Sequence, residues 1–220
     1  MTCITICGLT HIDDIVMCAQ AGADRLGFVI ESPMPVPWNL SREEAGLLID
    51  AAAGRALRVA VVGGDVDAVG DILDVCRPDI VQLDGDAPAA TVAAIAERGD
   101  VRVIKTMRIP AFAPADHADA LATEAGMFIA SGADEILLDA VADAHPTGAP
   151  VTWELAAAVA TQLDAPVILA GGLRAENVVT ALRAVHPWGV DVITGVDGEH
   201  NRKSVPRVHA FVAAVHGADG

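Results

Sequence analysis

Short apolar runs rich in β-branched residues alternate along the chain with alanine-rich amphipathic segments. The apolar runs predict eight strands, at residues 3–6, 25–30, 57–62, 80–83, 101–105, 135–138, 166–170 and 190–193. The amphipathic segments predict eight helices, at residues 12–21, 42–53, 66–76, 88–98, 114–131, 153–162, 176–185 and 204–215. Regular alternation of strands and helices is typical of a parallel sheet built from βα units.

Eight βα units in 220 residues predict a compact (β/α)₈ TIM barrel, which we expect to form a single domain over residues 1–220. An open doubly wound sheet would normally carry a GxGxxG turn after its first strand, but residues 6–11 read ICGLTH. No linker, charge block or low-complexity segment marks a second domain.

The composition limits the partners. With 30 acidic against 14 basic residues, the net charge of −16 argues against a nucleic-acid or anionic-membrane surface. An anionic substrate must therefore be attracted by local dipoles and a few cations. Because the sequence shows no signal peptide and no apolar run long enough to span a membrane, we expect a cytoplasmic protein. The four cysteines lack zinc-ligand spacing and are expected to be reduced thiols.

Two glycine-containing strand ends occur in succession between residues 165 and 198. The first strand ends in Gly171-Gly172 before a predicted helix, and the next strand ends in Thr194-Gly195. Two neighbouring strand ends of this kind leave backbone N–H groups free, which favours a phosphate-binding site. Alternatively, the glycines only permit tight turns with positive φ.

A similar glycine pair follows the third predicted strand, where VAVVGGDVDAV at residues 59–69 echoes VILAGGLRAENV at residues 167–178. Gly63-Gly64 is therefore either a second phosphate site, as a substrate with two phosphates would require, or simply a turn.

In a TIM barrel the reacting groups lie at the C-terminal ends of the strands. The polar candidates at these positions are Cys7, Asp84, Lys105, Arg108, Asp139 and Thr194. Cys7 precedes Gly8, and we expect its thiol to enter the barrel mouth beside backbone donors that favour the thiolate. We expect Asp139 to face it and to hold its proton more tightly than in water.

A thiolate facing a carboxylic acid suits a reaction that removes a proton from carbon and delivers another to oxygen, such as an aldose-to-ketose isomerisation. Other roles stay open for both groups. Cys7 can be a small buried apolar side chain, and Asp139 can cap the loop that follows it.

The stretch ITICGLTHIDDIVMCAQAGADRLGFVI resembles the opening of the phosphoribosylanthranilate isomerases, a family of the tryptophan pathway. The resemblance continues, in order, through DIVQLDGD, VIKTMRI, EILLDA, PTGAPVTW, VILAGGLRAENV and GVDVITGVDG. It implies an Amadori rearrangement of N-(5-phosphoribosyl)anthranilate without a metal or organic cofactor. The implied partner is a small phosphorylated sugar, and the protein would be a monomer or a homodimer.

By this resemblance Cys7 would be the general base at the sugar C2′ and Asp139 the general acid that opens the ribose ring. The substrate phosphate would contact Gly172, Thr194 and Gly195, next to Gly171. A loop that holds Thr147 and Gly148 would close over the substrate.

The sequence departs from the family pattern in two places. Asp84 stands where the family usually has histidine, at a position expected to contact substrate. The second βα loop reads ESPMPVPWNLS and contains no arginine, whereas the family's loop carries one that faces the anthranilate carboxylate. Arg108 is either the replacement cation at the substrate or a solvated loop residue.

Two further interpretations therefore remain beside the first. One is a related phosphoribosyl isomerase of the histidine pathway, or a dual-substrate form, if Gly63-Gly64 binds a second phosphate. The other is a non-catalytic paralogue that binds a sugar phosphate. The presence of both Cys7 and Asp139 argues against a binding protein, which needs neither group.

Overall fold

The computed structural model describes residues 1–109, 117–140 and 151–219 of the chain. Within these residues, eight parallel strands form a closed barrel in which β1 pairs with both β9 and β2. The strands are β1 (Cys3–Ile6), β2 (Arg25–Ile30), β4 (Leu57–Val62), β5 (Ile80–Leu83), β6 (Arg102–Ile109), β7 (Glu135–Ala140), β8 (Val167–Ala170) and β9 (Gly189–Val192). This confirms the predicted (β/α)₈ fold.

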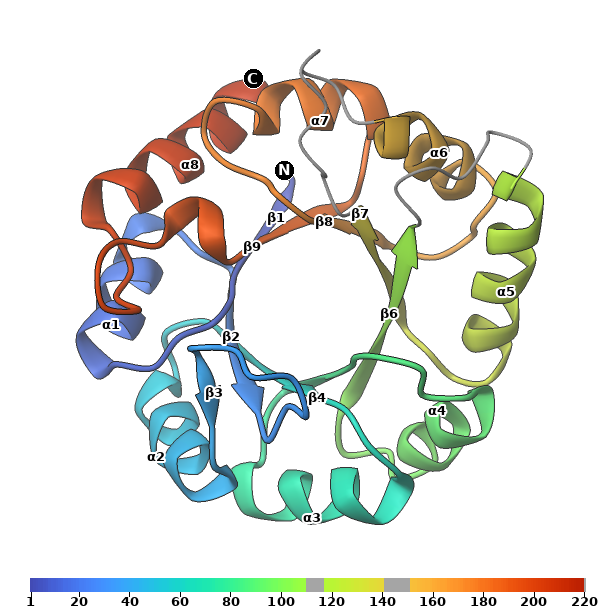
Figure 1. Ribbon diagram of the computed structural model, residues 1–220, viewed down its shortest axis with the longest axis horizontal. Helices are drawn as coiled ribbons and strands as arrows, with labels where there is room; N and C mark the ends of the chain where they lie inside the picture. The colour runs from blue at the N-terminus through green and yellow to red at the C-terminus, as the bar shows by residue number, and fades with distance from the viewer. Residues whose placement is uncertain (110–116, 141–150, 220) are drawn as a thin grey trace.

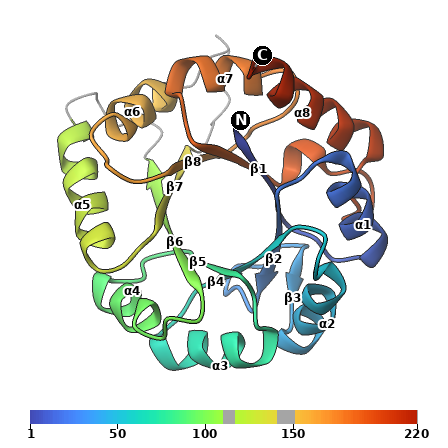
Figure 2. The ribbon, with the colours of Figure 1, turned by 180° about the vertical axis from the view of Figure 1, so that it is seen from behind.

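A ring of helices surrounds the barrel (Figure 1), and the same arrangement is visible from behind (Figure 2). The helices are α1 (Ile12–Ala21), α2 (Arg42–Ala52), α3 (Val66–Cys76), α4 (Ala89–Ala96), α5 (Ala118–Ala130), α6 (Val151–Ala160), α7 (Val178–Val185) and α8 (Val205–Ala218). A short 3₁₀ helix, η2 (Thr194–Val196), follows β9.

Local sequence signals define several helix ends. Ser41 and Glu44 form a capping box before α2, in which each side chain accepts a hydrogen bond from the other residue's backbone N–H. Asp65 caps α3 by accepting the N–H of Ala68. Gly22 ends α1 in the left-handed region, with φ 106°. These signals are local, which explains why the sequence predicted both ends of α1 and α3 correctly.

Alternate strand residues enter two separate cores. One set fills the gap between the sheet and the helices, where Phe28 of β2 and Phe211 of α8 are fully buried. The other set fills the barrel interior and consists of Cys7, Val29, Val59, Val61, Ile80, Ile104, Leu137 and Ile168. Small branched side chains thus close the barrel from below and support a site at its mouth.

A buried ion pair lies at the beginning of the strands. Arg25 of β2 donates two hydrogen bonds to Glu135 of β7, at 2.6 and 2.7 Å. The Arg25 guanidinium also lies 4.7 Å from the centre of the Trp188 ring. Because TIM-barrel chemistry takes place at the opposite end, this pair ties strands together rather than contacting substrate.

The structure differs from the predicted elements in two places that affect the site. β6 continues to Ile109, so Arg108 lies on a strand rather than in a loop. A two-residue strand absent from the prediction, β3 (Asn39–Leu40), pairs with the end of β2. This pairing holds the second βα loop against the barrel. The sequence did not predict β3, because two residues are too few to show a strand pattern.

Candidate active site

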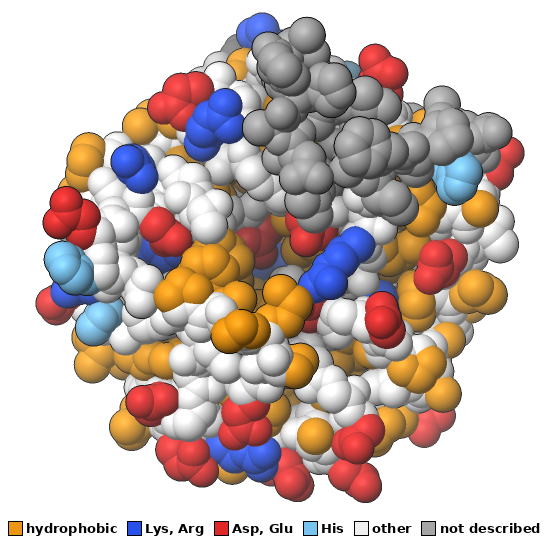
Figure 3. Space-filling model, viewed as in Figure 1, with side chains coloured by type: hydrophobic (Ala, Val, Ile, Leu, Met, Phe, Trp, Pro, Cys, Tyr) orange, Lys and Arg blue, Asp and Glu red, His pale blue; other side chains and the backbone are white. Residues whose placement is uncertain are grey.

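A cavity of about 270 Å³ opens at the C-terminal ends of the strands. Its described lining is Cys7, Val29, Ser32, Met34, Val36, Trp38, Val61, Gln82, Asp84, Thr106, Leu137, Asp139, Ala170, Gly171, Gly172, Leu173, Asp191, Val192, Ile193 and Thr194. Figure 3 shows hydrophobic side chains near the centre of this face, beside acidic and basic ones. The cavity therefore combines an apolar wall with groups that can exchange protons.

Cys7 directly follows β1, and its side chain is 2% exposed at the bottom of the cavity. The thiol lies against Gly27 of β2, where a Cβ atom would be 2.5 Å from the Cys7 Sγ. The sequence prediction that Cys7 enters the barrel mouth is therefore confirmed, and the missing side chain of Gly27 makes the necessary space.

A backbone donor does favour the Cys7 thiolate, as predicted, because the Gly8 hydrogen bond lowers the pKa of the thiol, but other effects outweigh it. Burial and the nearby Asp191 carboxylate raise the pKa of the Cys7 thiol well above its ordinary value. Lys203 and the hydrogen bond from the Gly8 backbone act in the opposite direction, but their effect is smaller. The resting site thus holds Cys7 as a thiol, because the cavity excludes the water that would solvate a thiolate.

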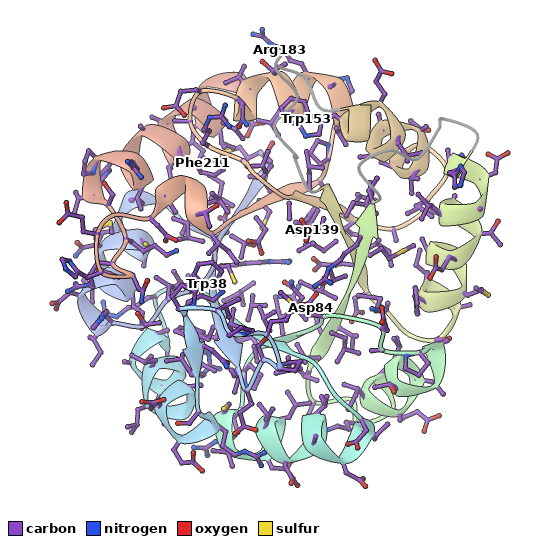
Figure 4. The ribbon with its side chains drawn as sticks, viewed as in Figure 1. Trp38, Asp84, Asp139, Trp153, Arg183 and Phe211 are labelled. Carbon is purple, nitrogen blue, oxygen red and sulfur yellow. The ribbon has the colours of Figure 1, made fainter. Side chains whose placement is uncertain are left out.

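Asp139 lies near the end of β7 and lines the same cavity. Burial raises the pKa of its carboxyl, with a further increase from Asp84 and a decrease from Arg108. This direction agrees with the sequence prediction. Figure 4 shows Asp139, Asp84 and Trp38 within the ring of strands, whereas Trp153 and Phe211 lie outside it.

The sequence analysis missed a third buried proton-exchanging group, Asp191 on β9. Asp191 is 7% exposed, and burial together with the charge of Asp139 raises the pKa of its carboxyl to about 7. A signal was present, because a single carboxylate interrupts the apolar run GVDVI at residues 189–193. Its period-two spacing from Ile193, which packs on the interior core, places it on the inward face.

Asp84, which lines the cavity, forms an ion pair with Arg108 of β6, which lines two neighbouring hollows. Asp84 follows β5, and its Oδ2 lies 3.5 Å from Arg108 Nη2. The Arg108 side chain is 52% exposed and remains accessible to solvent. The structure therefore pairs Asp84, which departs from the family pattern, with the arginine that is the candidate replacement cation, and Asp84 occupies one side of the guanidinium.

The turn after β8 supports the predicted phosphate site. Gly171 and Gly172 line the cavity with φ values of 96° and 62°, a conformation that requires glycine. Asn177 fixes the turn, because its side chain donates to the Gly172 carbonyl and accepts the Arg174 N–H. Helix α7 begins at Val178, two residues later than predicted, since Asn177 serves the turn.

Thr194 and Gly195 begin η2 after β9. Thr194 lines the main cavity, whereas Gly195 lines an adjoining hollow with Arg174 and Arg207. Gly195 also packs so closely on the backbone carbonyl of Leu173 that a Cβ atom could not be accommodated. Thr194 borders both hollows, so Gly195 adjoins the main cavity, and its contact with a substrate phosphate stays a prediction.

The second βα loop forms the apolar wall of the cavity through Met34, Val36 and Trp38. A Cβ atom at Gly8 would lie 3.2 Å from Trp38 Cγ, so the indole is packed over the turn that follows Cys7. The loop therefore presents an aromatic surface where the family resemblance implied an arginine.

Two other sequence candidates lie outside the main cavity, and a third cannot be placed among the described residues. Gly63 and Gly64 line a neighbouring hollow together with Asp84 and Asp86, whose carboxylates disfavour a phosphate. Lys105 points away from the main cavity and donates to the carbonyls of Gly85 and Thr106, each at 2.8 Å. Thr147 and Gly148 lie outside the described residues.

Within the described ranges, no group of three or more His, Cys, Asp or Glu side chains could hold a metal ion. A search of the same part of the chain found no helix with the length and apolar character needed to cross a membrane.

The family model for N-(5′-phosphoribosyl)anthranilate isomerase matches residues 4–214. The chain belongs to this family. A curated N-(5′-phosphoribosyl)anthranilate isomerase from Geotalea daltonii is 37% identical over 213 residues, covering 96% of this chain and 95% of the relative.

Solved structures of the family share the fold. A phosphoribosylanthranilate isomerase in complex with reduced 1-(o-carboxyphenylamino)-1-deoxyribulose 5-phosphate is 25% identical, with a TM-score of 0.80, and the match covers 99% of this chain and 100% of that chain. Monomers of the dimeric Thermotoga maritima isomerase give 26% identity and a TM-score of 0.81 at the same coverage. The sequence resemblance and the fold thus lead to the same family.

Proposed function

We propose that this chain catalyses the isomerisation of N-(5′-phosphoribosyl)anthranilate to the corresponding 1-amino-1-deoxyribulose phosphate. The observation that carries the proposal is the meeting of Cys7, Asp139 and the Gly171-Gly172 turn in one cavity. An Amadori rearrangement needs a general acid, a general base and a contact for the substrate phosphate, and this cavity contains a candidate for each.

We assign the first half of the reaction to Asp139. It gives a proton to the ribose ring oxygen, the C1′–O bond breaks, and the nitrogen lone pair forms a C1′=N bond. A buried carboxyl whose pKa is raised is suited to this role, because it takes up a proton more readily than an exposed aspartate does.

We assign the second half to Cys7 as its thiolate. It removes the C2′ proton, the released electron pair forms the C1′=C2′ bond, and the iminium nitrogen becomes neutral. The resulting enolamine becomes the ketone when C1′ gains a proton and the C2′ hydroxyl loses one. The reaction is therefore redox-balanced within the substrate and needs no cofactor.

Substrate orientation follows from the two ends of the cavity. We propose that the phosphate lies at Gly171, Gly172, Thr194 and Gly195, where the close packing of Gly195 on Leu173 also holds the two turns together. The aryl group would lie on Trp38, with its carboxylate toward Arg108. The complex of a structural relative with reduced 1-(o-carboxyphenylamino)-1-deoxyribulose 5-phosphate supports a ligand with these two ends.

One assay tests the proposal. Purified protein is added to freshly made phosphoribosylanthranilate, and the loss of anthranilate fluorescence is followed. Loss above the protein-free rate is expected, and its absence would overturn the proposed activity. Analytical ultracentrifugation under the assay conditions would distinguish a monomer from a homodimer. The dimeric relative from Thermotoga maritima supports a homodimer.

A further inference from the structure

Asp191 lies on β9, between β7, which carries Asp139, and β1, which Cys7 follows, and all three residues line one cavity. Asp139 of β7 pairs in register with Ala170 of β8. Leu169 pairs with Val190, so Ala170 is the neighbour of Asp191 on β9. Asp191 in turn pairs with Thr5 on β1, the strand that Cys7 follows. Across β7, β8 and β9, Ala170 is therefore the one residue between Asp139 and Asp191 at this level of the sheet, and its side chain is a methyl group.

The charged groups around Asp191 do not neutralise it directly. In the described part of the chain, no donor is hydrogen-bonded to its carboxylate. Lys203 and Arg25 lower the pKa of Asp191, but burial and the charge of Asp139 have larger effects and raise it. Both cations already have partners of their own, because Lys203 binds Asp197 at 2.5 Å and Arg25 binds Glu135.

Cys7 lacks a proton acceptor in the mechanism described so far. Its thiol is buried, and Asp191 is the carboxylate with the largest effect on it, followed by Asp84. If the thiol proton moved to Asp191, these two residues would still carry one negative charge, and the thiolate would form without a charged carboxylate beside it. In a buried site, forming a second negative charge costs far more free energy than moving the existing charge from Asp191 to Cys7.

Taking the proposed function as its basis, we propose that Asp191 relays a proton between Cys7 and Asp139. In the resting state Asp191 holds a proton, Asp139 is ionised and Cys7 is a thiol. Asp191 supplies the proton that Asp139 passes to the ring oxygen, and it becomes a carboxylate. It then accepts the thiol proton, leaving the thiolate that attacks the C2′ hydrogen.

The protons balance over these steps. One proton leaves Asp191 for the ring oxygen, one returns to it from Cys7, and Cys7 regains one from C2′. All three groups are then in their resting states when the enolamine forms. For the ketone, Asp139 accepts the hydroxyl proton, Asp191 gives one to C1′, and the proton on Asp139 returns to Asp191.

The first test is the pH profile of Asp191→Asn. In the wild type kcat/KM is expected to fall as the pH rises through about 7, because Asp191 loses the proton that it supplies. In the variant kcat is expected to fall about 100-fold or more, and this alkaline limb should disappear. If the activity of Asp191→Asn still falls as the pH rises through about 7, the relay is overturned. A residue with a purely structural role would lower the activity without changing its pH dependence.

The second test needs no turnover. Alkylation of Cys7 by iodoacetamide is followed against pH, with peptide mass spectrometry to separate Cys7 from Cys3, Cys18 and Cys76. Asp191→Asn removes a negative charge and should shift Cys7 alkylation to lower pH. An unchanged profile would overturn the coupling. If the wild type lacks isomerase activity, the proposed function fails, and this test still decides the coupling.

A second variant covers the case in which Asp191→Asn does not fold. Asp139→Asn retains Asp191 and removes its charged neighbour, so the carboxyl that titrates near pH 7 should titrate at lower pH. The measurement is the ¹³C chemical shift of labelled aspartate carboxyls. Asp164→Asn, on an exposed loop residue, is the control and should leave that titration in place. The same titration in Asp139→Asn as in the wild type would contradict the relay.

Discussion

Gly27 on β2 faces the thiol of Cys7 so closely that an added Cβ atom would lie 2.5 Å from Sγ and 2.9 Å from the Cys7 Cβ. Real Cβ atoms do not approach other atoms at such distances. The position of the thiol therefore depends on the absence of a side chain on the neighbouring strand.

We predict that Gly27→Ala lowers kcat about 10- to 100-fold, because the thiol must turn away from its position in the cavity. Gly126 of α5 is the control, since an added Cβ has nothing within 4 Å. Gly126→Ala should leave kcat unchanged and raise the melting temperature slightly, because alanine favours a helix interior. Full activity in Gly27→Ala would contradict the assignment of Cys7.

Cys7→Ala and Asp139→Asn should each lower kcat by about two to four orders of magnitude, the usual effect of removing a positioned base or acid. Steady-state kinetics and circular dichroism measure activity and folding. Cys18 and Cys76 are also buried but lie on helices away from the cavity. Alanine at either should affect stability alone, and a variant of Cys7 or Asp139 with wild-type kcat would remove its residue from the mechanism.

The Asp84–Arg108 pair should set the affinity for the anthranilate carboxylate. Arg108→Ala is expected to raise KM about thirtyfold, which corresponds to the loss of about 2 kcal/mol from a charge-assisted hydrogen bond. Asp84→Asn should lower KM, because it removes a carboxylate that competes for the guanidinium. If Arg108→Ala has no effect while Met34→Arg improves kcat/KM, the pocket accepts a less charged aglycone.

Gly195→Ala should damage the phosphate site through the backbone. Its added methyl group would collide with the Leu173 carbonyl, so the turns after β8 and β9 would have to separate. We expect a raised KM, a raised inhibition constant for inorganic phosphate and a lower melting temperature. Gly217→Ala on α8 has open space around it and serves as the control. Unchanged phosphate inhibition in Gly195→Ala would show that the anion binds elsewhere.

Asp191 should also make stability depend on pH. Its carboxyl has a pKa of about 7 in the folded chain against 3.8 as the ordinary value, so folding disfavours the charged form. This penalty is absent below pH 3.8 and grows by about 1.4 kcal/mol per pH unit until the pH reaches the folded pKa. Urea unfolding should therefore show that Asp191→Asn gains stability over the wild type as the pH rises from 5 to about 7, and that the gain is constant at higher pH. An advantage that does not change with pH would contradict the buried charge.

The periodic pattern of the chain was sufficient to predict the barrel. Strands such as Leu57–Val62 and helices such as Val66–Cys76 have the predicted bounds, because hydrophobic spacing and helix caps are local properties. The same pattern placed Cys7 and Asp139 at strand ends, and the closed parallel sheet brings those ends to one cavity. The loop positions of Thr147 and Gly148 remain predictions.

The sequence by itself determined the order of elements, the family and most residues of the site, since each depends on residue type and spacing. Only the tertiary structure decided how those residues are charged and packed. Cys7 is a thiol because neighbouring strands exclude water and place Asp191 beside it, and Gly195 serves packing because two loops meet there. Electrostatics and steric exclusion depend on distances between residues far apart in the chain, and those distances exist only after the barrel has closed.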